Sequence, residues 1–265
     1  MDKRQLLKMA ENSAFISGIY NYCDRWCERC AYTRRCMSYA MEKESFSDEE
    51  SHDINNEKFW SGLHDSFRLT RELLQDFMEA ENIALSPEDL DEAKKEMEVI
   101  SKRSKENPLT QDGTAYSTSV TAWLTAHEQL FTDRQEELTR ELELGIGYAR
   151  ASAAAIVNLV DVIRWYQDLI RVKLMRALDG AELDKEFGWS EEEKEFPSDS
   201  DGSAKVALIG IERSLGAWGE LQKHLPQETD SIMVILIQLE RLRKSIEKHF
   251  PQARRFVRPG FDQEV

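Results

Sequence analysis

The chain has 265 residues, of which 41% are hydrophobic and 32% charged, a composition typical of a helix-rich globular protein with one large or two small domains. Its net charge of −15 repels nucleic-acid phosphates and excludes generic DNA or RNA binding. No apolar run reaches the roughly 18 residues of a membrane span. The apolar core of the first residues is too short for a signal peptide, so a cytoplasmic location is expected.

Apolar residues recur at helical spacing along most of the chain, and glycine and proline, which interrupt helices, are scarce. Residues 1–22 predict a short amphipathic helix or an ordered lead-in. Residues 42–57 are acidic and polar, which indicates a solvated linker. The Ser86-Pro-Glu-Asp sequence is typical of a helix start, with serine as the N-cap. The longer predicted helices span 58–81, 86–107, 117–144, 148–178, 204–224 and 229–250.

Three interruptions separate these helices. A turn is predicted from Thr110 to Gly113, and Gly145 and Gly147 predict either a kink or a tight reversal. Residues 180–202 predict a second acidic loop, which the aromatic side chains could pin to the protein body. Those aromatic residues are Phe187, Trp189 and Phe196.

These elements predict an all-α fold, a multi-helix bundle of about five to seven helices with a small N-terminal four-cysteine module. The expected domains are the cysteine module at 1–41, the acidic linker at 42–57 and the helical bundle at 58–265, which contains the acidic loop.

The strongest chemical signal is a cluster of four cysteines with the spacing C-x3-C-x2-C-x5-C. Thiolates are the preferred ligands of soft cations and iron–sulfur clusters, so this cluster predicts a metal centre. If the segment is helical, its first three cysteines lie on one face and the fourth returns from the loop 31–35. The predicted ligands are Cys23, Cys27, Cys30 and Cys36.

Two kinds of centre fit these ligands, zinc and an iron–sulfur cluster. In an unbroken helix, Cys23 and Cys30 would lie about 10 Å apart, which is too far for one zinc ion and favours a [4Fe-4S] cluster. A kinked segment would still accommodate zinc. Either centre carries negative charge that nearby arginines would offset. Two disulfides or four buried thiols are the remaining alternatives. The arginines are Arg25, Arg29, Arg34 and Arg35.

Two resemblances bear on this segment. C-x3-C-x2-C is the spacing of the radical SAM cluster motif, but here Arg29 precedes the third cysteine, Cys36 could fill the open iron position, and no βα alternation follows. That family is therefore rejected. The segment CDRWCERCAYTRRC resembles the N-terminal motif of uncharacterised bacterial helical proteins with CDRWCERC-type sequences. The resemblance implies a shared cysteine site and a helical body, and it implies no activity.

Other chemistries have weaker support. A dimetal bundle site needs two Glu-x-x-His pairs on core helices, whereas the one such spacing, Glu49 to His52, lies in the acidic segment. His127 is expected to be a satisfied core histidine rather than a ligand. Asp161, Arg164 and Asp168 predict an ion-pair set on one helix. No nucleotide-binding or hydrolase motif occurs, and no catalytic residue is assigned.

The sequence thus predicts a cytoplasmic metal-binding helical protein whose four-cysteine centre is structural or redox-sensing. The alternatives are a redox metalloenzyme or electron-transfer protein with an iron–sulfur cluster, and a helical scaffold for a partner. No nucleic-acid or membrane partner is expected, and a protein partner or a homo-oligomer is compatible with the sequence. The substrate and the biological process are open.

Overall fold

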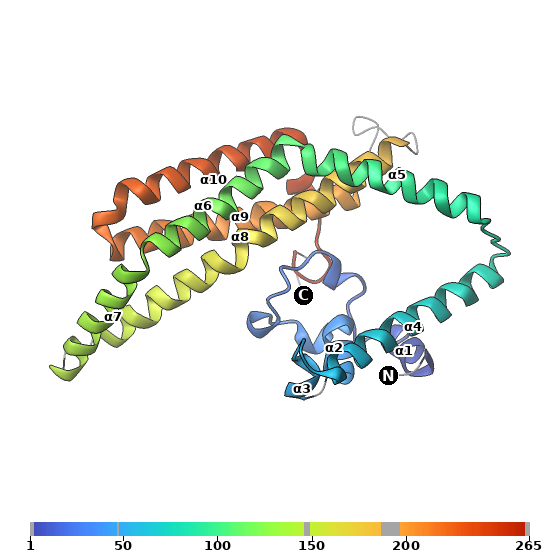
Figure 1. The fold of residues 1–265 in the computed structure, drawn as a ribbon, viewed down its shortest axis with the longest axis horizontal. Helices are drawn as coiled ribbons and strands as arrows, with labels where there is room; N and C mark the ends of the chain where they lie inside the picture. Colours follow the sequence, from blue (N-terminus) through green and yellow to red (C-terminus); the bar gives the residue numbers. More distant parts are fainter. Residues whose placement is uncertain (1–2, 47, 146–148, 187–196, 263–265) are drawn as a thin grey trace. The chain divides into compact units, whose positions relative to one another are not determined.

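The structure is a computed structural model that describes residues 3–46, 48–145, 149–186 and 197–262. Within these ranges all regular structure is helical, with ten α-helices, five short 3-10 helices and no strand (Figure 1). The predicted all-α class is confirmed, whereas the predicted number of helices is wrong. Among the same residues, no helix combines the length and the apolar character needed to cross a membrane.

The described residues form two compact units. The first, called the cysteine unit, comprises the residues up to Glu96 together with those from Val257 onward. The second, called the bundle unit, runs from Met97 to Phe256, so the division lies within helix α5.

The cysteine unit contains three short helices. The first, α1, lies in the stretch 1–22, where a short helix was one of two predictions, whereas α2 and α3 were not predicted and explain part of the larger helix count. Part of the acidic segment 42–57 is helical, because it holds the end of α2 and all of α3. Asp48 caps α3 by accepting a hydrogen bond from the Ser51 backbone N–H at 2.8 Å. The α-helices of this unit are α1 (Lys3–Ala10), α2 (Met37–Ser45), α3 (Glu49–His52), α4 (Glu57–Ala80) and the start of α5 (Pro87–Glu106).

Helices α5 and α6 begin at the caps that the sequence encodes. Ser86 and Asp89 cap α5 reciprocally, since each side chain accepts a hydrogen bond from the backbone N–H of the other, at 3.1 and 2.8 Å. Asn107 ends the α5 segment and caps α6, where its side chain accepts from the Leu109 N–H at 3.0 Å, with proline at the first helical position.

The bundle unit is built on four helices that pack in the closed order α6, α8, α9, α10. Its core includes Tyr166 and Ile170 of α8, and Ile211 and Trp218 of α9, all of which are fully buried. Figure 1 shows α7 and the first part of α8 extending past the end of this four-helix core. The helices are α6 (Pro108–Ala126), α7 (Glu128–Glu143), α8 (Ala149–Glu186), α9 (Asp199–His224) and α10 (Thr229–His249).

Two predicted interruptions differ in the structure. The turn at 110–113 is wrong, because these residues lie inside α6. Gly113 serves helix packing there, since a Cβ atom at this position would lie 3.3 Å from Leu174 Cδ1 on α8. The single helix predicted at 117–144 is two helices in the structure, because α6 ends at Ala126 and α7 begins at Glu128.

The predicted acidic loop 180–202 is wrong at both of its ends. Helix α8 continues to Glu186, and α9 begins at Asp199. Ser198 and Asp201 form a capping box that sets this start, because the Asp201 carboxylate accepts from the Ser198 N–H at 2.8 Å. The predictions for Ile146, Gly147, Phe187, Trp189 and Phe196 lie outside the described residues.

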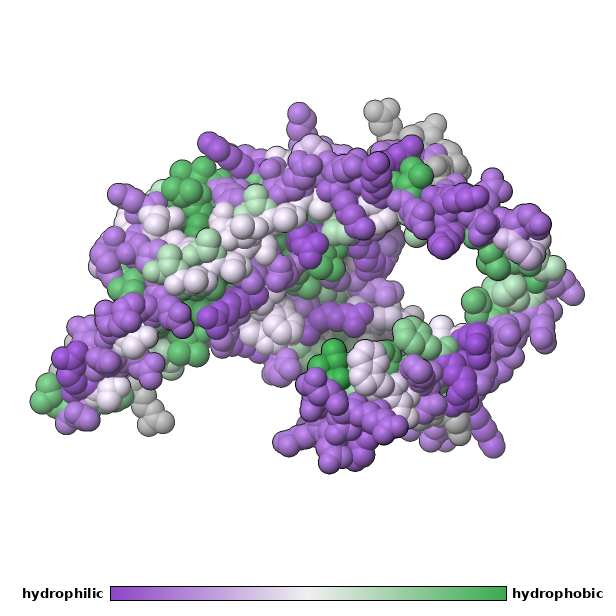
Figure 2. Space-filling view, viewed as in Figure 1, coloured by the Kyte–Doolittle hydropathy of each residue, from purple (hydrophilic) through white to green (hydrophobic). Residues whose placement is uncertain are grey.

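The two units bury very different amounts of apolar side chain. Among the described residues of the cysteine unit, Ile19 and Leu69 are the buried hydrophobic side chains. Several large hydrophobic residues of α4 are exposed instead, including Trp60, Phe67 and Leu74 at seven-residue spacing. Figure 2 shows hydrophobic surface where α4 is followed by α5, where Ile83 and Leu85 are exposed.

Candidate metal centre

The segment that carries the four cysteines is a chain of turns and not an α-helix. Short 3-10 turns span Cys27–Arg29 and Thr33–Arg35. Arg25 has a left-handed backbone with φ of 57°, which cannot continue a right-handed helix. The Asp24 side chain accepts a hydrogen bond from the Trp26 N–H at 3.2 Å and stabilises this turn. The condition under which the first three cysteines would share a helical face is therefore not met.

The turns nevertheless bring the four cysteines together by another route. All four line one small cavity with a volume of about 20 Å³. Each is half-buried, and none forms a disulfide. Two backbone interactions hold the middle pair, because the Cys30 N–H donates to the Cys27 carbonyl at 3.1 Å and the Tyr32 N–H donates to Cys30 Sγ at 3.4 Å. An N–H directed at a sulfur also stabilises negative charge on that sulfur.

The electrostatics of Cys27 reflect this convergence. Burial raises the pKa of the Cys27 thiol to about 11, with further contributions from the negative charge of Glu42 and from the other three cysteines. The other three thiols thus lie within electrostatic range of Cys27. Without a cation, this arrangement disfavours the thiolate form of Cys27, whereas a bound cation would favour it.

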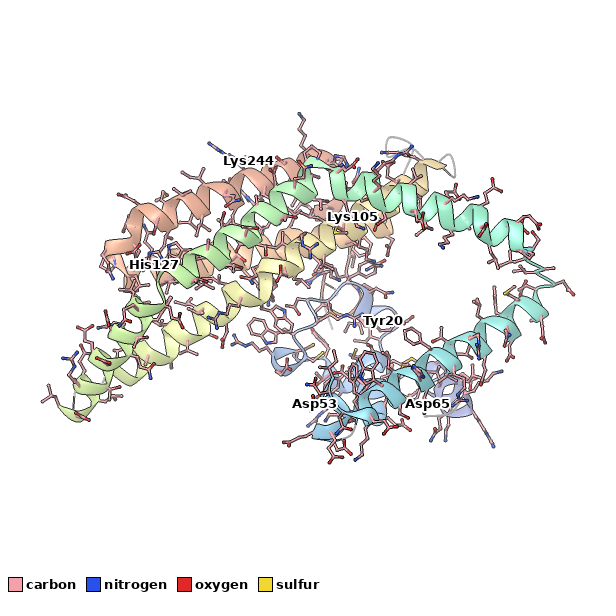
Figure 3. The ribbon with its side chains drawn as sticks, in the orientation of Figure 1. Tyr20, Asp53, Asp65, Lys105, His127 and Lys244 are labelled. Atoms are coloured by element: carbon pink, nitrogen blue, oxygen red, sulfur yellow. The ribbon has the colours of Figure 1, made fainter. Side chains whose placement is uncertain are left out.

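Aromatic and basic side chains surround the cavity. Tyr20, Trp26 and Tyr32 are among the residues that line it, and Figure 3 shows Tyr20 in this region. The Arg29 guanidinium lies 3.9 Å from the centre of the Trp26 ring. Of the four arginines expected to offset the centre's charge, Arg25 also lines the cavity, and all four are exposed at the surface.

The sequence analysis missed one wall of this cavity, which the far end of the chain supplies. Phe261 lines the cavity and packs edge-on against Tyr32, with the ring centres 5.1 Å apart. Gly260 permits this approach, because its φ is 76° and an added Cβ would lie 2.8 Å from Ile16 Cδ1. The Arg258 side chain pairs with Asp262 at 2.8 Å and lies over Phe261. No local sequence signal links these residues to the cysteines.

The donor set fits a soft metal ion, but the side chains are not in coordination geometry. Within the described ranges, no group of three or more His, Cys, Asp or Glu side chains is arranged to hold a metal ion. All four thiols nevertheless line the same cavity.

The other residues singled out in the sequence have structural partners. Nδ1 of His127 lies 2.6 Å from the Trp123 carbonyl oxygen, and Nε2 lies 2.7 Å from the Glu228 carboxylate. The predicted hydrogen bonds of His127 are therefore confirmed, but the residue is half-buried at the junction of α6 and α7 rather than in the core (Figure 3). His52 is exposed and bonds the Phe46 carbonyl.

The predicted ion-pair set on α8 is divided between two environments. The Asp168 carboxylate accepts a hydrogen bond from the Ser117 hydroxyl at 2.8 Å, which ties α8 to α6. Asp161 and Arg164 line a groove between α7 and α8. In the same unit, Arg254 forms ion pairs with Glu212 and Glu247.

Comparison with protein-family models, with curated proteins and with solved structures gives no match to this chain. The candidate metal centre therefore rests on the residues and geometry described above.

Proposed function

We propose that the four cysteines bind a single zinc ion and that this centre holds the cysteine unit in its fold. The observation that carries the proposal is the cavity of about 20 Å³ that all four thiols line. All four thiols line it, as the four ligands of one metal ion would, and a small cavity favours a single ion over a larger cubane cluster.

The path of the backbone also favours zinc over a cluster. The argument against zinc was the separation of Cys23 and Cys30 along an unbroken helix. The left-handed residue at Arg25 and the 3-10 turn at Cys27–Arg29 remove that argument, because the segment is not the unbroken helix that the separation assumed. Four cysteine thiolates form the usual tetrahedral donor set of structural zinc sites.

The composition of the unit explains why it would need a metal. A unit of this size with two buried hydrophobic side chains among its described residues has too little apolar burial to offset the conformational entropy of folding. A structural metal supplies that missing free energy, because the site exists only in the folded chain.

The same donor set supports a structural role over a catalytic one. Four protein thiolates fill the tetrahedral positions of zinc and leave no open position for water or substrate. The Tyr32 N–H would stabilise the Cys30 thiolate, and the surrounding aromatic rings would exclude water. Such thiols stay available as ligands in a reducing compartment, which is consistent with a cytoplasmic protein.

Metal analysis of the full chain purified anaerobically tests the proposal. We expect about one zinc per chain for the wild type, and its loss in Cys27→Ser and in Cys30→Ser. Thr33→Ser is the matched control, because Thr33 lines the cavity without a ligand atom of this kind, and it should retain the metal. Retention of full metal content by both cysteine variants would refute the ligand assignment. If the protein instead contains iron with acid-labile sulfide, and its visible absorbance bleaches on reduction, the centre is a redox-active iron–sulfur cluster and not zinc.

A further inference from the structure

The outward face of α10 carries apolar side chains in its first half and positive side chains in its second half. The opposite face of this helix is buried in the bundle core, with Ile232, Leu239 and Ile246 among its residues. On the outward face, alternating steps of three and four residues keep the side chains in one line along the helix. This line, called the α10 row, consists of Val234, Ile237, Arg241, Lys244 and Lys248.

The side chains of the α10 row are exposed. Val234 is 67% exposed and Ile237 is 46% exposed. The Lys244 side chain (Figure 3) is 70% exposed, and Arg241 and Lys248 are exposed as well. Apolar side chains that gather on one exposed helix face and are bordered by charged ones mark interaction sites.

The positive charge of this region is local. Residues 240–255 hold six lysines and arginines and two glutamates, a net charge of +4 within a chain whose net charge is −15. Both glutamates pair most closely with arginines outside the α10 row, Glu240 with Arg243 and Glu247 with Arg254, at 2.7 Å each. The row itself therefore stays positive.

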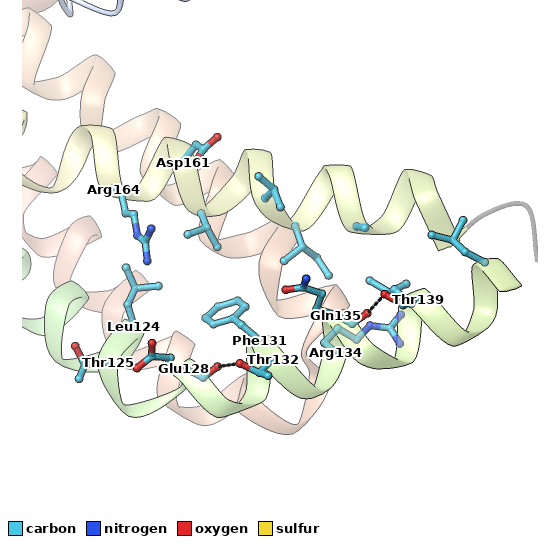
Figure 4. Close-up of a pocket in the computed structure, with 16 residues that line it drawn as sticks. Leu124, Thr125, Glu128, Phe131, Thr132, Arg134, Gln135, Thr139, Asp161 and Arg164 are labelled. Carbon is cyan, nitrogen blue, oxygen red and sulfur yellow. Dashed lines mark hydrogen bonds between the residues drawn. The ribbon is translucent and has the colours of Figure 1, made fainter.

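The charges of the α10 row are of one sign, unlike those around the apolar groove between α7 and α8. That groove is lined by acids and bases together, including Glu128, Asp161 and Arg164 (Figure 4), so its charges do not identify a partner. From Val234 to Lys248 the α10 row contains no acid. A single sign of charge specifies a partner of the opposite sign.

An acidic helix fits the α10 row better than a nucleic acid or a membrane does. Those two are broad polyanions, and they would repel the acidic remainder of this chain. A helix is about 10 Å wide and contacts the row alone. Alternating steps of three and four residues, as between Val234, Ile237 and Arg241, are also the spacing by which two helices pack along each other.

We propose that the outward face of α10 binds an acidic amphipathic helix of a partner protein. Apolar side chains of that helix pack on Val234 and Ile237. Its aspartate or glutamate side chains pair with Arg241, Lys244 and Lys248. The face belongs to the bundle unit, and its binding chemistry is separate from that of the four cysteines.

Fluorescence anisotropy of a labelled synthetic peptide, titrated with the full chain, tests this assignment. The probe is a helical peptide with leucines at alternating three- and four-residue steps in one half and glutamates that continue the same line in the other half. We expect the wild type to bind it, and Arg241→Glu with Lys244→Glu to weaken binding by about 10-fold or more, because two attractions become repulsions. Val234→Ser should weaken binding by about threefold, because apolar contact is lost.

The matched control replaces two lysines on other helices and leaves the α10 row intact. Lys185→Glu with Lys223→Glu makes the same change in net charge, on α8 and α9. Lys223 and Lys244 are each 70% exposed, and each lies near a glutamate of its own helix, at 2.6 and 3.5 Å. This control should bind the peptide as the wild type does.

A second peptide, with lysines in place of the glutamates, makes the test specific to charge. Arg241→Glu with Lys244→Glu should bind it more tightly than the wild type does. Equal weakening in the control variant, or a wild type that does not bind the glutamate peptide, would overturn the proposal. So would anionic lipid vesicles that bind through Arg241 and Lys244 when the peptide does not, or a dimer in sedimentation velocity that the Arg241–Lys244 double variant abolishes. Those two results would assign the face to a membrane and to a second copy.

Discussion

The two units of this protein hold their shapes by different means. In the bundle unit, large side chains such as Trp218, Tyr116 and Tyr166 are fully buried between helices. In the cysteine unit, the buried hydrophobic side chains among the described residues are Ile19 and Leu69, and four thiols converge on one cavity. Both units are helical, so helix content alone does not indicate how much packing stabilises each of them. One unit is stabilised by packing, and we propose that a bound metal stabilises the other.

The largest expected difference between the units is the loss of stability when a tryptophan in each is replaced by alanine. Trp218 is fully buried, so Trp218→Ala should lower the free energy of unfolding of the bundle unit by about 3–5 kcal/mol. Trp60 is 48% exposed on α4, and Trp60→Ala should cost about 1 kcal/mol or less. Urea denaturation of both variants measures the difference. Equal losses would remove the distinction between a packed unit and an unpacked one.

Alkaline pH provides a second test, at Tyr116 in the bundle unit. Burial raises the pKa of Tyr116 to about 12, whereas an unfolded chain releases this proton near pH 10. The unfolded state therefore loses its proton first, and stability should fall between pH 10 and 12 by up to about 3 kcal/mol. In Tyr116→Phe this contribution is absent, so its stability should fall less steeply. Parallel pH curves for the two proteins would contradict the burial argument.

The contact between the chain terminus and the cysteine cavity is open to a smaller test. Gly260→Ala places a methyl group against Ile16 and forces a side chain into a left-handed backbone, at a cost of about 2 kcal/mol. We expect Phe261 to withdraw from the cavity and metal loss to a chelator to become faster. Thr33→Ser serves as the reference variant. An unchanged rate of metal loss would mean that the terminus contributes nothing to the site.

The smallest expected effects compare two glycines within α9. Gly219→Ala meets nothing within 4 Å and should stabilise the bundle unit by about 0.5–1 kcal/mol, because alanine favours a helix more than glycine does. Gly210→Ala brings a methyl group to 3.0 Å from Tyr166 and should destabilise it. Thermal unfolding distinguishes the signs, and a stabilising Gly210→Ala would show that the α8–α9 contact is looser than described.

Local signals in the sequence were sufficient for much of the fold. The serine cap at Ser86 and the apolar periodicity of the long segments predict where helices α5, α8, α9 and α10 lie, although α8 continues past its predicted end at residue 178 to Glu186. The role of Asn107 as the cap of α6 was not predicted. Gly113 was misread as a turn because its role is a close approach to Leu174 on another helix. That information is tertiary, and the sequence around Gly113 does not contain it.

The candidate site divides in the same way. Clustering of the four cysteines was visible in the sequence, and the structure places all four on one cavity. The path of their backbone could not be predicted, because the spacing of the cysteines is compatible with a helix and does not indicate the left-handed conformation of Arg25. Phe261 could not be foreseen either, since it reaches the cavity from the opposite end of the chain. The zinc assignment remains a proposal.

Hydrogen exchange measured by mass spectrometry, with and without a zinc chelator under reducing conditions, tests the central claim most directly. If a metal holds the cysteine unit, chelation should accelerate amide exchange in residues 19–45 by at least about 10-fold and leave the buried turns of α8 and α9 protected. Unchanged exchange in residues 19–45, or equal loosening of both units, would contradict the account.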